Sequence, residues 1–387
     1  MSVLTNARLV TPNGILSRGW MHLEASRIVT LGTDSPPPDA RPARDLGGSW
    51  IMPGFVDLHV HGGGGASMTE GSQEQILRAV EFHRGHGTTR TLISLVTAPL
   101  ETMLAGAAAV ADLVEAHAPG IAGCHLEGPF LSPVRRGAQD PRSLLPPDPE
   151  ILERLLAAGR GTVRMVTVAP ELPGACELIR RVVAARSVAA IGHTDASYEE
   201  VLAGVEAGAT VATHLFNGMR PLHHRDPGPV AAALERPEVI CELINDGVHL
   251  DPAVIRLVVA SVGPERVAFI TDAIAATGMA DGDHYLGPLR VRVVSGQAKL
   301  MEGGNIAGST LTMDRAFRRA VLEVGLSIEV AVEATSSTPA RILSPAALRG
   351  CLEAGQQADL VVLDNDLNML AVMTAGDWVG PAPGRLL

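Results

Sequence analysis

An alternation of short apolar stretches with amphipathic helical patterns, running from Ile51 to about Leu343, constrains the fold of this chain most. Sequences such as EQILRAVEFHRGH and DPAVIRLVVASV lie between the apolar stretches, with apolar residues at helical spacing. This alternation favours a parallel (β/α)₈ barrel. An open doubly wound sheet is the alternative, but the signature GxGxxG is missing after the first strand. We expect strands at residues 51–58, 89–95, 121–126, 163–168, 188–192, 210–213, 239–244 and 266–271.

The two ends of the chain have a different pattern from the middle. Residues 1–50 read as short strands, turns and a proline-rich loop. Residues 346–387 return to strand character, with ADLVVLDNDLNML as the clearest case. We therefore expect a small discontinuous β-sandwich domain of residues 1–50 and 346–387 beside a catalytic barrel of residues 51–345.

Charge and composition exclude several classes of partner. The formal net charge is −11 and there is no basic run, which argues against nucleic acid and anionic membrane surfaces. No apolar stretch approaches the roughly 18 residues of a membrane-spanning helix, and MSVLTNARLVTPNG does not read as a signal peptide. The 4 cysteines are scattered and show no CxxC spacing. They are typical of small buried residues in a protein of a reducing compartment. The expected location is the cytoplasm.

The stretch GFVDLHVHGGGG raises the first question about chemistry. Alternate side chains of an extended strand share a face, so His59 and His61 point the same way and could bind a metal together. The glycines would let the backbone approach whatever occupies the site. A polar strand end running into a flexible turn is the competing interpretation, and this stretch alone does not decide between them.

Other polar residues follow the expected strands at the point where each strand ends. In a parallel barrel, catalytic groups sit at the carboxyl ends of the strands. Taken singly, each residue fits a hydrogen-bonded structural role or a helix cap. Taken together, six strand ends that carry His, Glu or Asp favour a metal-dependent hydrolase. Beyond His59 and His61, these residues are Glu127, His193, His214, His249 and Asp272.

This pattern resembles the amidohydrolase superfamily, which has an HxH motif after the first barrel strand, histidines after the fifth and sixth, and an aspartate after the eighth. A finer similarity is to N-acetylglucosamine-6-phosphate deacetylases. It rests on PGFVDLHVHG, HLEGPFLSPVRRGA, GHTDA, ATHLFNGM, DGVHL, TDAIAATG and LMEGGNIAGSTLTMD, which occur in that family's order over essentially the whole chain.

The resemblance implies a divalent metal held by Glu127, His193 and His214. Many amidohydrolases bridge two metals with a carboxylated lysine, but the single lysine here, Lys299, lies in a segment that reads as a hairpin beyond the eighth strand. Glu127 would take its place. His59 and His61 keep the option of a second ion, so one or two per chain are expected. Zn²⁺ is the first expectation and Fe²⁺ the alternative.

The implied reaction removes the acetyl group from N-acetylglucosamine-6-phosphate and yields glucosamine-6-phosphate and acetate, a step of amino-sugar catabolism or recycling. A metal-bound hydroxide would attack the amide carbonyl. Asp272 would accept the proton as general base and return it, as general acid, to the departing amine. His249 is expected to orient the substrate.

The phosphate needs its own anchors, and Arg225 in PLHHRDPG is the best candidate because a guanidinium matches phosphate geometry. The resemblance places this region near a subunit interface, which implies a homodimer. Gln139 stands where relatives commonly carry a histidine. The further substrate-binding residues expected are Ala138, Asn217, Gly218, Asp246, Ile306, Ala307 and Gly308.

Three alternatives stay open at this stage. The substrate could be a related sugar such as N-acetylgalactosamine-6-phosphate. The chain could be another amidohydrolase, for instance an N-acyl-amino-acid hydrolase. From a different class, it could be a non-catalytic metal-binding relative, although the intact Asp272 and the complete His and Glu set speak against that.

Overall fold

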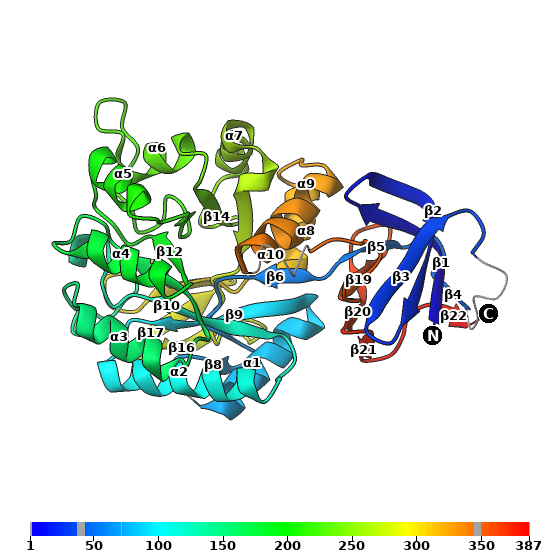
Figure 1. The fold of residues 1–387 in the computed structure, drawn as a ribbon, viewed down its shortest axis with the longest axis horizontal. Helices are drawn as coiled ribbons and strands as arrows, with labels where there is room; N and C mark the ends of the chain where they lie inside the picture. The colour runs from blue at the N-terminus through cyan, green and yellow to red at the C-terminus, as the bar shows by residue number, and fades with distance from the viewer. Residues whose placement is uncertain (1, 37–42, 71, 344–349, 387) are drawn as a thin grey trace.

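The computed structural model describes residues 2–36, 43–70, 72–343 and 350–386, and Figure 1 shows a helix-covered barrel beside a β-sheet domain. Eight parallel strands form the barrel sheet, in the order β15-β14-β13-β12-β11-β10-β9-β6. They are β6 (Phe55–Asp57), β9 (Thr88–Val96), β10 (Ile121–Glu127), β11 (Val163–Val168), β12 (Val188–Ile191), β13 (Val211–Ala212), β14 (Ile240–Ile244) and β15 (Val267–Ile270).

The two ends of this sheet, β6 and β15, meet just beyond their last residues. A parallel bridge joins Val60 to Ala273, and the backbone N–H of Asp272 donates to the carbonyl of His59 at 2.8 Å. The barrel is thus nearly closed, and the predicted fold class is confirmed. Closure also brings the residues that follow the first strand next to those that follow the last strand. In the sequence, these two groups of residues are separated by more than half of the chain.

Helices cover the outside of the barrel. They are α1 (Gln73–Gly85), α2 (Leu100–Glu115), α3 (Pro149–Ala158), α4 (Ala175–Ala184), α5 (Tyr198–Glu206), α6 (Gly228–Glu235), α7 (Pro252–Val262), α8 (Met313–Leu322), α9 (Ile328–Val332) and α10 (Thr338–Leu343). Local signals set several helix starts. Ser197 and Glu200 form a reciprocal capping box at α5, and Asp148 caps α3 ahead of Pro149.

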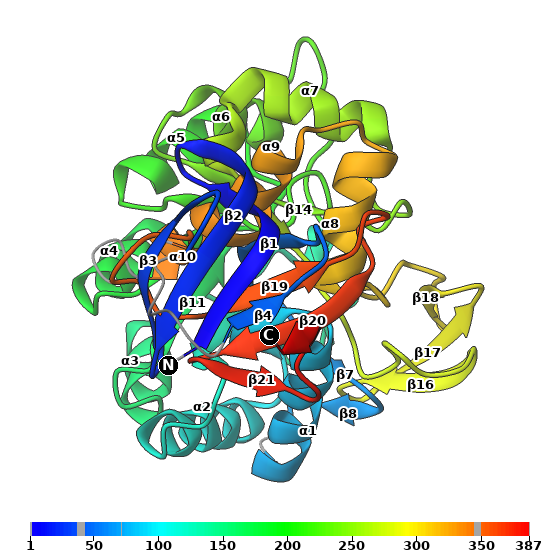
Figure 2. The same cartoon turned by 90° about the vertical axis from the view of Figure 1, so that its right-hand side faces the viewer.

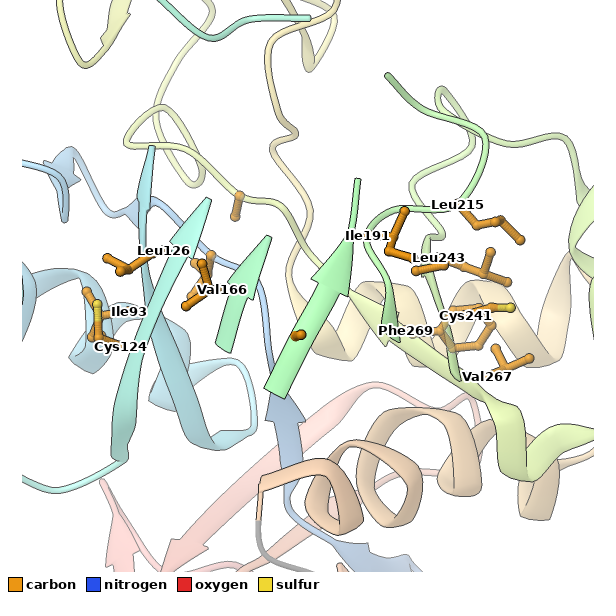
Figure 3. Packing of buried hydrophobic residues seen from close by; sticks show 14 of the residues in the cluster. Ile93, Cys124, Leu126, Val166, Ile191, Leu215, Cys241, Leu243, Val267 and Phe269 are labelled. Atoms are coloured by element: carbon orange, nitrogen blue, oxygen red, sulfur yellow. The ribbon is translucent and has the colours of Figure 1, made fainter. Parts of the chain in front are cut away.

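Each barrel strand divides its side chains between the helices and the interior. In Figure 3, Cys124 and Leu126 of β10 and Cys241 and Leu243 of β14 lie in the buried apolar cluster. Because side chains alternate along a strand, His125, Glu127 and Glu242 point into the barrel instead. The rest of the interior is a separate apolar cluster that includes Leu92, Met165, Val211 and Ile270. Polar side chains therefore lie at the carboxyl end of an otherwise apolar barrel.

The second domain is built from both ends of the chain, as Figure 2 shows in blue and red. Its nine-stranded sheet has the order β21-β20-β19-β5-β1-β2-β3, with β4 paired to β1 and β22. Residues from β1, β2, β3, β19 and β20 share one buried cluster, so the sheet wraps around its own core. The strands are β1 (Ser2–Thr11), β2 (Gly14–Glu24), β3 (Arg27–Thr33), β4 (Ala43–Asp45), β5 (Trp50–Pro53), β19 (Leu360–Leu363), β20 (Met369–Thr374), β21 (Asp377–Val379) and β22 (Arg385–Leu386).

One expected strand, at residues 51–58, is two strands in different sheets. Trp50–Pro53 pairs with β1 and β19, whereas Phe55–Asp57 pairs with β9 of the barrel. Gly54 separates them, and a Cβ there would lie 2.3 Å from the side chain of Thr89. The β-branched side chain of Thr89 therefore leaves no room for a Cβ at this position, and glycine fits there. A continuous apolar run conceals this crossing, because both halves are buried.

A small antiparallel sheet is inserted after the barrel's last strand. It consists of β16 (Gly282–Leu286), β17 (Leu289–Val294) and β18 (Gln297–Leu300). Lys299 lies on β18 opposite Arg292, so the hairpin expected there is present. A short hairpin of β7 (Gly62–Gly63) and β8 (Ala66–Ser67) follows the histidine pair. Among the described residues, no helix is long and apolar enough to cross a membrane.

Candidate metal centre and active site

A cavity of about 320 Å³ opens at the carboxyl ends of the barrel strands. Most of the predicted site residues line it, although they follow six different barrel strands and the inserted sheet. This is the position that parallel barrels use for chemistry. The predicted residues in the lining are His61, Glu127, Ala138, Gln139, His193, His214, Asn217, Gly218, His249, Asp272, Ile306 and Gly308.

Glu127, His193 and His214 form a first cluster, which we call the glutamate set. Nε2 of His193 lies 3.0 Å and Nε2 of His214 lies 3.1 Å from Oε1 of Glu127, and the two nitrogens are 3.2 Å apart. One donor atom of each residue lies within 4.8 Å of the others, and all three side chains are buried. Two imidazoles and one carboxylate are the donors typical of catalytic zinc sites.

The other ring nitrogen of each histidine decides which nitrogen is bare. Nδ1 of His193 faces the carbonyl oxygen of Arg135 at 2.9 Å, and Nδ1 of His214 faces that of Asn217 at 3.1 Å. A carbonyl only accepts, so each Nδ1 carries the hydrogen and Nε2 of the neutral ring is a bare acceptor. Two bare nitrogens and a carboxylate oxygen at these separations repel one another unless a cation lies among them. The residues therefore fit a divalent ion.

His59, His61 and Asp272 form a second cluster, which we call the histidine-pair set. The Nε2 atoms of the two histidines are 2.9 Å apart, and Oδ1 of Asp272 lies 3.2 Å from Nε2 of His61. Nδ1 of His61 faces the carbonyl of Ser94 at 3.0 Å, so its Nε2 is the bare nitrogen as well. The candidate ligand atoms again lie within 4.8 Å of one another.

Glu127 lies between the two sets. Its Oε1 belongs to the glutamate set, while its Oε2 lies 3.3 Å from Nε2 of His61. When no ion is bound and the histidines are protonated, burial raises the pKa of Glu127, but the charges of His59 and His193 and the hydrogen bonds from His193 and His214 outweigh burial and hold it well below its ordinary value. Burial lowers the pKa of His61, yet hydrogen bonds with Asp272 and Glu127 raise it to about 9. Without an ion, protons take the cation's place.

The backbone is strained where the ligands project. His193, His214 and Asp272 all have positive φ, at 46°, 31° and 50°. Such angles are rare for residues other than glycine and cluster at functional sites. Neighbouring glycines relieve crowding, because a Cβ at Gly218 would lie 2.8 Å from Nδ1 of His193 and one at Gly308 would lie 2.7 Å from the carbonyl oxygen of Asp272.

Gln139 makes a contact that the sequence did not indicate. Its Oε1 accepts from the backbone N–H of Thr97 at 2.8 Å, and its Nε2 donates to Oε2 of Glu127 at 2.6 Å. The backbone N–H can only donate, which fixes the amide orientation and directs the NH₂ group to the carboxylate. Gln139 lines the cavity and also holds a candidate metal ligand.

His249 and Asp246 form a pair at the cavity wall. Nδ1 of His249 lies 2.7 Å from Oδ2 of Asp246, whose other oxygen accepts from the backbone N–H groups of Val248 and His249. Burial lowers the pKa of His249, but the hydrogen bond and charge of Asp246 more than compensate and raise it. Of this pair only His249 lines the cavity.

Three other predicted residues lie outside the cavity lining. His59 lies beneath it with no exposure. Ala307 is packed under the inserted sheet, where its N–H donates to Ala298. Arg225 is exposed on a loop, where Nη1 donates to His224 at 2.8 Å. Within this one chain, Arg225 is not brought together with the other site residues.

Comparison with known proteins gives a consistent result. The model of the amidohydrolase family matches residues 50–379. The chain is 33% identical over 377 residues to N-acetylgalactosamine-6-phosphate deacetylase of Escherichia coli, which covers 97% of this chain and 98% of that protein. It is 31% identical over 384 residues to N-acetylglucosamine-6-phosphate deacetylase of Bacillus subtilis, with 97% and 96% covered.

Solved structures agree over nearly the full length. A mutant N-acetyl-D-glucosamine-6-phosphate deacetylase from Mycobacterium smegmatis, in complex with N-acetyl-D-glucosamine-6-phosphate, is 46% identical with a TM-score of 0.93, covering 98% of this chain and 99% of that chain. The corresponding enzyme from Thermotoga maritima is 32% identical with a TM-score of 0.88, covering 98% and 100%.

Proposed function

The chain belongs to the amidohydrolase family, and we propose that it removes the acetyl group from N-acetylglucosamine-6-phosphate, releasing glucosamine-6-phosphate and acetate. One observation carries the proposal: the glutamate set and Asp272 converge on one cavity, in a chain 46% identical to an enzyme that was solved with this sugar phosphate. Because function resides in the site rather than in the barrel, this convergence counts for more than the shared fold.

A divalent metal fits the donor atoms of the glutamate set. We propose Zn²⁺ there, with Fe²⁺ as the alternative, and a second ion in the histidine-pair set. Bound in the glutamate set, the ion supplies a water of lowered pKa and a Lewis acid for the amide carbonyl. The chain's own contribution is to hold Glu127, His193 and His214 in the required protonation state.

Asp272 is proposed as the general base and acid. Burial raises the pKa of this carboxyl, but the charge of His59 and the hydrogen bond and charge of His61 outweigh burial and lower it. Asp272 is therefore ionised at neutral pH, as a proton acceptor must be. It lines the cavity, from which it can return the proton to the departing amine nitrogen.

The substrate is held by the cavity wall. His249 presents a ring that Asp246 orients through Nδ1, and Gln139 lies in the same cavity wall. The loops at Ala138, Asn217, Gly218 and Ile306 to Gly308 supply the remaining contacts. We propose that the phosphate is bound by Arg225 across a homodimer interface, a role supported by its exposure and by its position outside the lining of its own chain's cavity.

A second candidate substrate is N-acetylgalactosamine-6-phosphate, the C4 epimer. The curated relatives favour it comparably, since a deacetylase of that sugar from Shewanella is 36% identical over 342 residues. We propose that the enzyme acts in the cytoplasm, which is supported by Cys124, Cys176 and Cys241, because none of these three described residues forms a disulfide.

The decisive experiment combines metal analysis of the purified protein with an amine-release assay. The panel contains N-acetylglucosamine-6-phosphate, its C4 epimer, unphosphorylated N-acetylglucosamine and an N-acetyl amino acid. We expect bound metal and fastest release from N-acetylglucosamine-6-phosphate. Metal-loaded protein that releases no amine from either phosphorylated sugar would contradict the proposal. Equal rates for N-acetylglucosamine with and without the phosphate would contradict the proposal that Arg225 binds the phosphate.

The shared site is tested at low substrate concentration by mixing two impaired variants. Arg225→Ala loses charged hydrogen bonds of about 1.5–3 kcal/mol, which corresponds to a roughly 10- to 100-fold higher KM for phosphorylated substrate. A mixed dimer of Arg225→Ala and Asp272→Asn subunits would contain one site with both native residues. Activity of the mixture well above that of either variant is expected, and simple additivity would exclude a shared site.

A further inference from the structure

The barrel interior contains a buried carboxylate that the proposed chemistry does not use. Glu242 lies on β14 and has no solvent exposure. Among the described residues, neither of its oxygens has a hydrogen-bond partner, and Nδ1 of His59 lacks one too. These two groups face each other, since Oε2 of Glu242 lies 3.7 Å from Nδ1 of His59.

The neighbouring polar groups are already engaged. The ring of His125 packs edge-on against His59, at 4.7 Å between centroids, but its nitrogens bond Ser94 Oγ and Thr167 Oγ1 at 2.9 Å each. Thr167 Oγ1 also bonds Thr213 at 2.9 Å. A buried carboxylate without a partner is strongly unfavourable, so a nearby donor is required. Among the described residues named here, His59 is the donor that remains for Glu242.

We propose that Glu242 is a positioning residue for an ion in the histidine-pair set, and that it acts by accepting the Nδ1–H hydrogen bond of His59. With the hydrogen held on Nδ1, Nε2 is the bare nitrogen directed at His61 and Asp272. The gap exceeds a hydrogen bond by about half an ångström, which a small rotation of either side chain closes. The inference rests on the proposed function, which places an ion there.

The partner distinguishes His59 from the other candidate ligands. His61, His193 and His214 each direct Nδ1 at a neutral backbone carbonyl, whereas His59 faces a carboxylate. A carboxylate behind an imidazole raises the basicity of the ligating nitrogen, and losing such a partner typically weakens metal binding about 10- to 100-fold. Glu242 should therefore act selectively on the histidine-pair set.

The test is a Zn²⁺ titration of the full-length protein against a chromogenic chelator, for wild type, Glu242→Leu and Glu242→Gln. Leu removes the acceptor, while Gln keeps its volume and an acceptor oxygen but not the charge. Thr213→Val is the matched control, because it removes a buried hydroxyl that bonds Thr167 rather than His59. We expect wild type to bind two ions, and Glu242→Leu to bind the weaker one about 10- to 100-fold less tightly.

Glu242→Gln should lie between wild type and Glu242→Leu, and Thr213→Val should resemble wild type. Should Glu242→Leu fail to fold, the Gln variant gives the same comparison. The inference is overturned if both Glu242 variants bind two ions like wild type, if Thr213→Val loses as much, or if wild type binds a single ion. Because no sugar is used, failure of the deacetylase proposal in the substrate panel leaves this result readable.

Discussion

The glutamate set and the histidine-pair set offer similar donors but are supported differently. The histidines of the glutamate set are oriented by carbonyls of Arg135 and Asn217, and both of these residues line the cavity. The histidine-pair set is oriented by Ser94 and Glu242, which belong to the barrel interior. The comparison teaches that substrate loops can influence the first set directly, whereas the second depends on core packing.

Loss of Glu127 should have the largest effect, because this residue faces both sets. We expect Glu127→Ala to reduce turnover by more than about 10⁴-fold, since nucleophile activation and carbonyl polarisation fail together. Metal analysis beside amine release measures this. Retention of tightly bound metal by the variant would contradict the assignment of Glu127 as a shared ligand.

Asp272→Asn separates catalysis from binding in the glutamate set. We expect kcat to fall about 10²- to 10⁴-fold, the usual cost of removing a general acid-base group, while the glutamate set keeps its ion. Steady-state kinetics and metal content are measured on the same sample. A near wild-type rate would show that another group moves the proton.

Gln139 tests whether the orientation of Glu127 matters. Gln139→Leu removes the donor to Oε2 and leaves the N–H of Thr97 unpaired, so ion affinity should fall about 10- to 100-fold in a chelator competition. Asn305→Ala is the control, since Asn305 lines the same cavity but its side chain donates to the carbonyl of Gly137 rather than to Glu127. Equal ion affinities in the two variants would show that Gln139 lines the cavity without supporting ion binding.

The smallest effect concerns the loop that follows the histidine pair. His83 is buried and bonds the carbonyl of Gly62 at 2.9 Å, and burial lowers its pKa to about 4. The unfolded chain binds this proton near pH 6.5, so stability falls as the pH drops through the range between the two values. From pH 7 to pH 5 the loss is about 2 kcal/mol.

Denaturant unfolding of wild type and His83→Gln across this range measures that loss. Glutamine can still donate to Gly62 but does not titrate, so its unfolding free energy should decline less. Any metal release at low pH is common to both proteins and cancels in the difference. Parallel curves would show that His83 is not held neutral.

Much of the fold and site was predictable because the signals are local. Helical spacing and apolar runs mark the alternating elements, and each polar residue at a strand end can be found by reading a few neighbours. The prediction of a single strand at residues 51–58 was wrong for the same reason. Local apolarity cannot reveal that the chain leaves one sheet and enters another at Gly54. Gln139 was expected to touch substrate, and its bond to Glu127 depends on Thr97, which is remote in sequence.

By itself, then, the sequence determined the barrel, its helical cover and the residue types that gather at the mouth, because periodicity and composition act over short stretches. Only the tertiary structure decided which nitrogen of each histidine is bare, that Glu127 faces both sets, and that Glu242 lies behind His59. Those properties depend on contacts between strands far apart in the chain, and hydrogen-bond partners at about 3 Å exist only once the barrel has closed.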